Sequence, residues 1–165
     1  MMNRNGMEES LTLELRPYEA TDLAEICSLF YETVHTVNAR DYTAEQLRVW
    51  APREPDEQRW HRSLLAHRAY VARAEGILVG FGDIADDGYL DRLYVHKDYQ
   101  RRGIAMALCR VLESCVEAPR LTVHASITAR AFFERRGYTV VSRQEVVLHG
   151  VSLTNFAMEK LRRLP

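Results

Sequence analysis

The stretch YVHKDYQRRGIAMALC, residues 94–109, decides the fold because it passes from a strand into a helix within a few residues. Its start continues the run YLDRLYV, which is rich in strand-forming residues, and its end has the apolar spacing of a helix. Two arginines and a glycine lie between them, at residues 101–103. A helix N-terminus presents unpaired N–H groups and about half a positive charge, so this junction can hold an anion.

The side chains at the junction suit a pyrophosphate. Gly103 lets a ligand approach the backbone without a Cβ in the way, and the small Ala105 keeps the first helical turn open. Arg101 and Arg102 add positive charge and several donors each. Glycines beside helix N-termini are also common in ordinary strand-to-helix turns, so the spacing alone favours neither interpretation.

Other ligand classes fit the sequence less well. The P-loop pattern G-x-x-x-x-G-K-[ST] and the dinucleotide pattern G-x-G-x-x-G are both absent. The formal net charge is -1, so no overall field attracts nucleic acid or an anionic membrane surface, and neither partner is expected. The leader MMNRNGMEES has no apolar signal core, and no run approaches the roughly 18 apolar residues of a membrane span. We expect a soluble cytoplasmic protein.

Cysteines and histidines give no metal pattern. Cys27, Cys109 and Cys115 lack metal-ligand spacing and are expected to be free thiols, mostly buried, in a reducing compartment. The histidines form no spaced constellation with cysteines or carboxylates. We therefore predict no metal.

Apolar periodicity predicts one domain over residues 11–165, after a flexible leader at residues 1–10. A strand is predicted from Leu11 to Pro17, followed by a helix that Thr21 can cap. Thr43 and Gln46 form a capping-box pattern that opens a second helix. A third short helix is expected around Trp60 and Leu64.

The remaining chain alternates short strands with two helices. AYVARA, ILVGFGDI and YLDRLYV predict a three-strand meander with turns at residues 75–76 and 87–88. A helix, the strand LTVHA, a second helix around residues 129–136 and a hairpin turning at His149 and Gly150 follow. This order predicts an α/β fold of mixed-sheet type, with helices packed on the sheet.

At this point the chain resembles the GNAT superfamily of acyl-CoA-dependent N-acyltransferases. Their phosphate-binding pattern Q/R-x-x-G-x-G/A stands here at residues 100–105, after the strand LYV. ASITARAFFERRGYTVV, residues 125–141, is similar to the family's second conserved segment. The resemblance covers roughly residues 11–161 and implies a mostly antiparallel sheet of about seven strands, with helices on both faces and a splayed strand pair forming the CoA cleft.

The resemblance also implies a set of cofactor-binding residues for acetyl-CoA. The phosphate-binding motif would hold the CoA pyrophosphate through Gln100, Arg101, Arg102, Gly103, Ile104 and Ala105. Leu93, Tyr94 and Val95 would flank the pantetheine arm, with Leu93 and Val95 pairing edge to edge with it. Ser126 would meet the cofactor near its thiol end.

Acyl transfer to an amine poses an acid-base problem. An amine of pKa about 10.4 must lose a proton at pH 7, at a cost of roughly 4 to 5 kcal/mol, whereas a thiol of pKa about 8.5 costs only about 2 kcal/mol. The base is therefore the more demanding role. Asp91 is our candidate, because strict alternation puts it on the apolar strand face of Leu93 and Val95, where desolvation would raise its pKa. The alternative is a solvated strand start at which Asp91 pairs with Arg92.

The candidate acid departs from the family pattern. Many relatives place a tyrosine in the second segment, where this chain has Phe133, which cannot donate a proton. Tyr94, Tyr138 or water would have to substitute, and Tyr94 is our first choice.

The first two helices shape the acceptor pocket in this superfamily, which makes Tyr31, His35, Asn38 and Trp50 the candidate substrate residues. A plain solvent face explains them equally well. We predict an N-acetyltransferase that moves an acetyl group directly to an amine of a small molecule or peptide. The alternative is a non-catalytic CoA-binding or protein-interaction module. A homodimer is among the expected states, because exposed edge strands often pair with a second copy.

Overall fold

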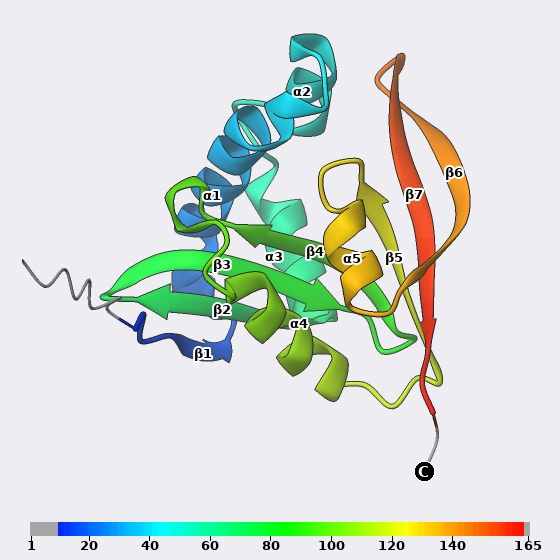
Figure 1. Ribbon diagram of the computed structural model, residues 1–165. Helices are drawn as coiled ribbons and strands as arrows, with labels where there is room; N and C mark the ends of the chain where they lie inside the picture. The colour runs from blue at the N-terminus through cyan, green and yellow to red at the C-terminus, as the bar shows by residue number, and fades with distance from the viewer. Residues whose placement is uncertain (1–9, 164–165) are drawn as a thin grey trace, which may run out of the picture.

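Seven strands form one sheet in the order β1-β2-β3-β4-β5-β7-β6 in the computed structural model, which describes residues 10–163 (Figure 1). All neighbours are antiparallel except β4 and β5. The strands are β1 Glu14–Pro17, β2 Arg68–Ala74, β3 Ile77–Ile84, β4 Tyr89–Val95, β5 Arg120–Ser126, β6 Thr139–Leu148 and β7 Val151–Leu161. The predicted mixed sheet and meander are confirmed, although β1 begins three residues later than Leu11.

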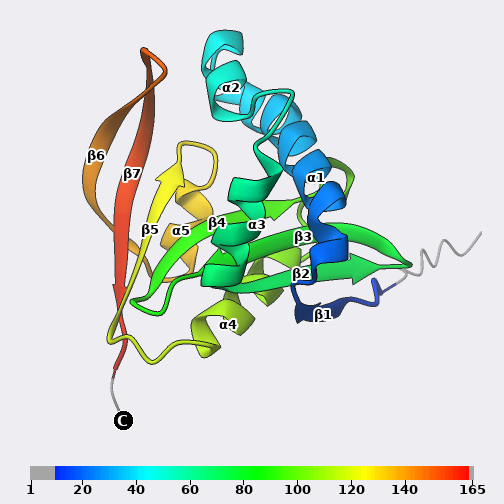
Figure 2. The same ribbon diagram turned by 180° about the vertical axis from the view of Figure 1, so that it is seen from behind.

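Helices cover both faces of the sheet, with α1 and α3 on one face and α4 and α5 on the other (Figures 1 and 2). The helices are α1 Leu23–Thr36, α2 Ala44–Trp50, α3 Glu57–Ala66, α4 Ile104–Ser114 and α5 Arg130–Arg135, with short 3-10 turns at Ala20–Asp22, Asn38–Arg40 and Lys97–Tyr99. No helix in residues 10–163 is long and apolar enough to cross a membrane. Of the predicted leader, all but Ser10 lies outside the described residues.

The helix starts follow the sequence with one correction. Thr43 and Gln46 exchange the two hydrogen bonds of the predicted capping box, at 3.2 and 2.8 Å. Thr21 does not cap α1, because it lies inside the 3-10 turn that precedes the helix. Asp22 occupies the position before α1 instead, and its carboxylate accepts the N–H of Glu19.

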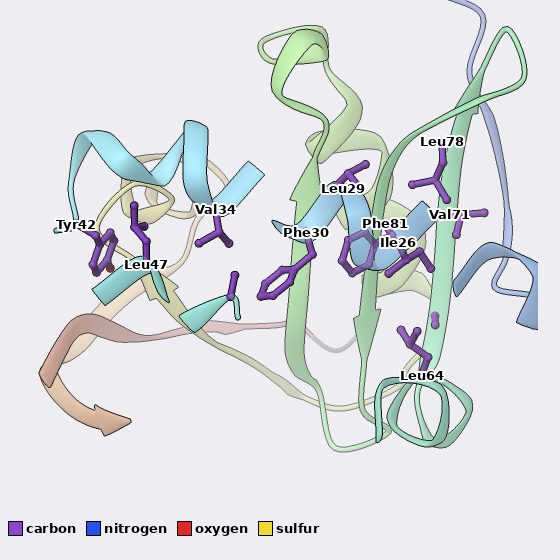
Figure 3. Packing of buried hydrophobic residues seen from close by; sticks show 12 residues of the cluster. Ile26, Leu29, Phe30, Val34, Tyr42, Leu47, Leu64, Val71, Leu78 and Phe81 are labelled. Carbon is purple, nitrogen blue, oxygen red and sulfur yellow. The ribbon is translucent and has the colours of Figure 1, made fainter. Parts of the chain in front are cut away.

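The main core lies between the sheet and the helices α1 and α3. Ile26 and Phe30 of α1 lie beside Phe81 of β3, while Val34 lies nearer to Leu47 of α2 (Figure 3). Leu64 of α3 belongs to the same cluster. On the other face, α4 packs so tightly that a Cβ at Gly82 would come within 2.8 Å of the Leu112 side chain and of the Arg92 carbonyl oxygen.

Strands β4 and β5 are paired over two residues only, Tyr89 with Thr122 and Leu90 with Val123. Beyond these pairs the two strands diverge, although β4 continues to Val95 and β5 to Ser126. The predicted splayed strand pair is therefore present.

A β-bulge in β4 changes the predicted alternation. Arg92 pairs with Asp83 and Leu90 pairs with Ile84, so Asp91 is the extra residue without a partner on β3. Leu90 and Leu93 consequently both pack on the α4 side. Asp91 therefore does not share a face with Leu93 and Val95. The prediction of strict alternation is wrong here, because a bulge reverses the side-chain order beyond it.

The edge strand β6 exposes apolar side chains, with Val141 and Val147 more than half exposed. This is the type of edge that the predicted homodimer would use, and the dimer stays a prediction. Cys27 and Cys109 are buried free thiols as expected, and Cys115 is only half-buried.

Asp22 ties the first edge of the sheet to α1. Its carboxylate is 1% exposed and accepts hydrogen bonds from Arg16 of β1 at 2.8 Å and from Arg73 of β2 at 2.9 Å. Burial alone would raise the pKa of Asp22, but the hydrogen bonds from Arg16, Arg73 and the Glu19 N–H lower it to about 2. Because the pKa is depressed in the folded state, this stabilisation is present above pH 4 and is lost as pH falls toward 2.

Asp22→Asn should lower the free energy of unfolding at pH 7 by about 3 kcal/mol, because it leaves two guanidinium groups with a neutral partner. Between pH 5 and pH 2 the free energy of unfolding of the wild type should fall by about 2 kcal/mol as Asp22 is protonated. The variant lacks this carboxylate, so its free energy of unfolding should not show that part of the fall. Urea unfolding across this range measures both effects. Asp86→Asn is the matched control, since Asp86 is 78% exposed in its pair with Arg68. Equal losses for the two variants would contradict this role of Asp22.

Candidate functional site

The loop before α4 has the backbone geometry of an anion site. Arg101 and Gly103 adopt left-handed conformations, with φ of 61° and 78°, and Gly103 is the N-cap of α4. Turns of this kind bring successive N–H groups to one side. A Cβ at Gly103 would meet no atom within 4 Å, so the space in front of this backbone is open. An anion can therefore approach the free N–H groups at the start of α4.

Side chains fix this loop independently of a ligand. Gln100 donates a hydrogen bond from Nε2 to the Val95 carbonyl oxygen at 2.8 Å, which joins the loop to the end of β4. Ile104 is buried beneath the helix start, while Ala105 is half-buried. The Arg102 guanidinium lies 5.1 Å from the Tyr99 ring centre, so this arginine is partly held by stacking.

One backbone edge of β4 faces the gap left by β5. His96 donates its N–H to the Val79 carbonyl oxygen of β3 at 2.8 Å. Because backbone groups alternate along an antiparallel ladder, those of Leu93 and Val95 point to the opposite edge, toward β5. The Val95 carbonyl oxygen is taken by Gln100 and by the Thr33 hydroxyl. The N–H groups of Leu93 and Val95 have no strand partner within residues 10–163.

A cleft of about 340 Å³ lies on the α1 side of this splayed pair. Six aromatic side chains line it: Phe30, Tyr42, Trp50, Trp60, Tyr89 and Tyr94. Val146, Leu148 and Leu153 of the β6 and β7 hairpin add an aliphatic wall. Both tryptophans of the chain are therefore in the cleft.

Asp91 places a carboxylate in this cleft. Its side chain is 32% exposed, and the bulge turns it to the same side as Tyr94. Burial raises the pKa of Asp91, and the negative charge of Asp83 raises it further, while Arg92, His67 and His124 act in the opposite direction. The expected raised pKa is thus present, although the face that produces it is not the predicted one.

The charge beside Asp91 is already neutralised. Arg92 binds the fully buried Asp83 with two hydrogen bonds, of 2.8 and 2.6 Å, and also donates to the Ser63 hydroxyl at 2.7 Å. His67 Nδ1 is 2.6 Å from Asp83 Oδ2 and 3.9 Å from Asp91 Oδ2. The alternative of an Asp91 ion pair with Arg92 is weak, because their closest distance is 3.7 Å.

His67, Asp83 and Asp91 bring three possible metal-ligand atoms within 4.8 Å of one another. The sequence spacing gave no sign of this cluster. Both oxygens of Asp83 already accept hydrogen bonds from Arg92, so a metal ion would have to displace a guanidinium. These residues are a poor fit to a metal, and its absence stays a prediction.

Tyr94 packs between Phe30 and Phe81, with ring centres 4.9 and 5.7 Å away. Burial raises the pKa of Tyr94 far above its ordinary value, so the hydroxyl keeps its proton at neutral pH. Tyr138, the other candidate acid, is buried on the α4 side and donates its hydroxyl to Glu113 at 3.0 Å. Phe133 is a core residue packed on Tyr138.

The end of β5 brings Ser126 and His124 to the cleft. Ser126 Oγ accepts the N–H of Ala129 at 3.0 Å, which fixes the turn before α5 and leaves the hydroxyl proton free to donate. The His124 ring lies 5.3 Å from the Tyr89 ring, edge to face.

Of the four candidate substrate residues, Trp50 lines the cleft and the other three do not. His35 Nε2 donates to the Ala51 carbonyl oxygen at 2.8 Å, and its ring lies 4.3 Å from the Tyr31 ring. Asn38 is buried in the 3-10 turn after α1. Of these three residues, His35 joins α1 to the end of α2 through its bond to Ala51.

Sequence reasoning missed Tyr42, Trp60 and Tyr89. The Tyr42 hydroxyl donates to the Thr154 carbonyl oxygen at 2.6 Å and accepts the Ile127 N–H at 2.9 Å. Its partners lie 112 and 85 residues away in sequence, so no local motif indicates the contact.

Comparison with known proteins agrees with this geometry. Residues 38–160 match the model of the acetyltransferase (GNAT) domain. An uncharacterised N-acetyltransferase of Escherichia coli, YafP, is 36% identical over 88% of this chain and 94% of its own length.

Solved structures show the same fold. The crystal structure of a GCN5-related N-acetyltransferase from Rhodopseudomonas palustris has a TM-score of 0.89 and 34% identity, covering 95% of this chain and all of its own. The PaiA N-acetyltransferase of Thermoplasma acidophilum, solved with coenzyme A, has a TM-score of 0.73 and 18% identity over 92% of this chain and all of its own. From the matched domain, the identity to YafP and the splayed strands, we conclude that this chain belongs to the GNAT family of acetyl-CoA-dependent N-acetyltransferases.

Proposed function

We propose that the chain transfers an acetyl group from acetyl-CoA directly to an amine bound in the aromatic cleft. The observation that carries this proposal is the position of Asp91, a carboxylate of raised pKa beside the open edge of β4. A cofactor lying along that edge and an amine entering from the α1 side would meet at this point. The chemistry then depends mostly on positioning the two reactants.

The cofactor residues proposed are those of the open loop and the open strand edge. The N–H groups from Arg101 to Ala105 would bind the pyrophosphate at the start of α4. The free N–H groups of Leu93 and Val95 would pair with the pantetheine arm, as a strand pairs with an edge. Ser126, whose hydroxyl proton is free, would contact the arm near the sulfur.

Asp91 is the proposed base. It accepts a proton from the bound ammonium, directly or through a water, and releases it to solvent. Because burial raises the pKa of Asp91, this transfer opposes a smaller pKa difference than it would with an ordinary aspartate.

The amine nitrogen then attacks the acetyl carbon, so an N–C bond forms and the C–S bond breaks. Tyr94 is the proposed acid: it donates its proton to the departing sulfur and regains one from the nitrogen through water. The nitrogen loses two protons in all, one to solvent and one to the thiol.

A second candidate function is a CoA-binding module without turnover, favoured by one observation. Phe133 and Tyr138 belong to the core, so the tyrosine acid of the family is absent at Phe133. Thiol release from acetyl-CoA with a panel of amines, amino acids, polyamines and peptides separates the two functions. Transfer predicts amine-dependent release, whereas the binding module predicts thermal stabilisation by acetyl-CoA without it. Absence of both effects would exclude both functions.

Asp91→Asn should lower kcat/KM by about 100-fold or more, because it removes the base. In the wild type, activity should rise with pH through the raised pKa of Asp91, since the carboxylate must be ionised to accept a proton. The variant should lose that acidic limb of the pH profile. Asp86→Asn is the matched control on an exposed carboxylate. An unchanged rate and pH profile in Asp91→Asn would show that the base is elsewhere.

Tyr94→Phe should lower kcat less than Asp91→Asn does, by about tenfold, because the thiol is the easier group to protonate. Its Kd for CoA should stay close to wild type, since the ring still packs between Phe30 and Phe81. Single-turnover kinetics and CoA titration check the two expectations. A loss equal to that of Asp91→Asn would assign Tyr94 a larger role than that of the acid.

Gly103→Val should raise the Kd for CoA by about tenfold or more, because the new side chain strains a positive φ and projects into the open space before α4. Arg101→Ala should change the Kd by less, since it leaves the backbone N–H groups in place. Isothermal titration with CoA measures both. Gly150→Val controls for strain alone, because Gly150 has the same φ of 78° and open surroundings in the distant hairpin turn. Equal effects of Gly103→Val and Arg101→Ala would mean that the arginine side chain carries the binding.

A further inference from the structure

The charge of the aromatic cleft is set by one group. Asp91 and Arg92 are the lining residues with full charges in the described chain. Arg92 is 13% exposed, and its donors are directed to Asp83 and Ser63, so its charge is compensated by a buried carboxylate. The uncompensated charge is that of Asp91. The cleft therefore attracts a cation and repels a ligand that carries its own carboxylate.

Within residues 10–163, the polar lining of the cleft adds no second full negative charge. Ser126, Thr154 and Asn155 contribute neutral groups. An ammonium that enters the cleft therefore has the Asp91 carboxylate as its charged partner.

The side chains that line the cleft favour an amine attached to a flat apolar group. Aromatic rings come from α1, the segment before α2, the last residue of α2, α3 and β4, and aliphatic side chains come from the β6–β7 hairpin. Tyr42 and Trp50 pack edge to face at 5.1 Å, so their rings are held in place before a ligand binds. Rings fixed in this way favour an aromatic or other flat group over a flexible chain.

Two hydrogen bonds fix the position of α2 relative to β7 beside the cleft. Gln46 Nε2 of α2 donates to the Ser152 carbonyl oxygen at 2.9 Å, and the hydroxyl of Tyr42, just before α2, donates to the Thr154 carbonyl oxygen at 2.6 Å. The cleft volume of about 340 Å³ suits a small ligand better than an extended polypeptide.

We infer that the acceptor is a small primary amine, cationic at neutral pH and without a carboxylate, carried on an aromatic or similarly flat apolar group. Its ammonium is held by Asp91 while its ring lies against Trp50 and the neighbouring aromatic side chains. The inference rests on the proposed transfer function, because it names the substrate class of the same site.

The test compares 2-phenylethylamine with matched amines. Butylamine removes the ring, phenylalanine adds a carboxylate, and spermidine and a short peptide represent the excluded classes. Thiol release gives kcat/KM, and tryptophan fluorescence in the presence of CoA gives a Kd independent of turnover, since both tryptophans lie in the cleft. We expect 2-phenylethylamine to have a kcat/KM at least about tenfold higher, and a Kd at least about tenfold lower, than each of the other amines.

Two variants assign the selectivity to residues. Trp50→Ala should reduce the preference for 2-phenylethylamine over butylamine, with Trp60 left as the fluorescent reporter. Asp91→Asn should reduce the ratio of the Kd for phenylalanine to the Kd for 2-phenylethylamine. Asp86→Asn changes a carboxylate that does not line the cleft, so it should leave both ratios at their wild-type values.

The outcomes separate the substrate class from the reaction. Selective binding of 2-phenylethylamine without thiol release would support the inferred ligand class but contradict the proposed acetyl transfer. If spermidine or the peptide gave thiol release with a kcat/KM equal to or higher than that of 2-phenylethylamine, the acetyl transfer would be supported. The inferred substrate class would then be wrong. Failure of 2-phenylethylamine to bind more tightly than butylamine would also overturn it.

Discussion

The short parallel contact between β4 and β5 is the constraint on which the site depends. Two residue pairs, at Tyr89 and Leu90, hold the strands together at one end, and the bulge at Asp91 follows at once. Past that point β4 keeps its ladder to β3, and no strand in residues 10–163 pairs with its other edge. An unpaired strand edge inside a sheet leaves backbone N–H and C=O groups without hydrogen-bond partners, which is unfavourable unless a ligand or water binds them. The proposed role of this edge is to receive the extended arm of the cofactor.

The bulge also divides the chemistry between the two faces of the sheet. Leu93 and Val95 stay on the α4 side, whereas Asp91, Arg92 and Tyr94 face the aromatic cleft. Placing Arg92 there requires the buried carboxylate of Asp83, because an unpaired guanidinium in such surroundings would be costly. Asp83 in turn helps to raise the pKa of Asp91. One irregularity in one strand therefore produces the charge, the orientation and the basicity of the site.

Much of this arrangement could be predicted from sequence, and the failures have a common cause. Local patterns give β3 and β4 with their exact ends, the capping box at Thr43, and the motif around Gly103. The side to which Asp91 points could not be predicted, because a bulge is a property of the pairing with β3. Tyr42 reaches the cleft through contacts across more than 80 residues, which no periodicity encodes.

Residue-resolved amide hydrogen exchange on β4 tests the central claim most directly. If the cofactor arm occupies the open edge, CoA should slow exchange at Leu93 and Val95 while leaving Tyr94, whose N–H already faces β3, close to its rate in the free protein. Slowed exchange confined to the α4 loop, with no change at Leu93 and Val95, would contradict the claim that the splayed edge of β4 receives the cofactor.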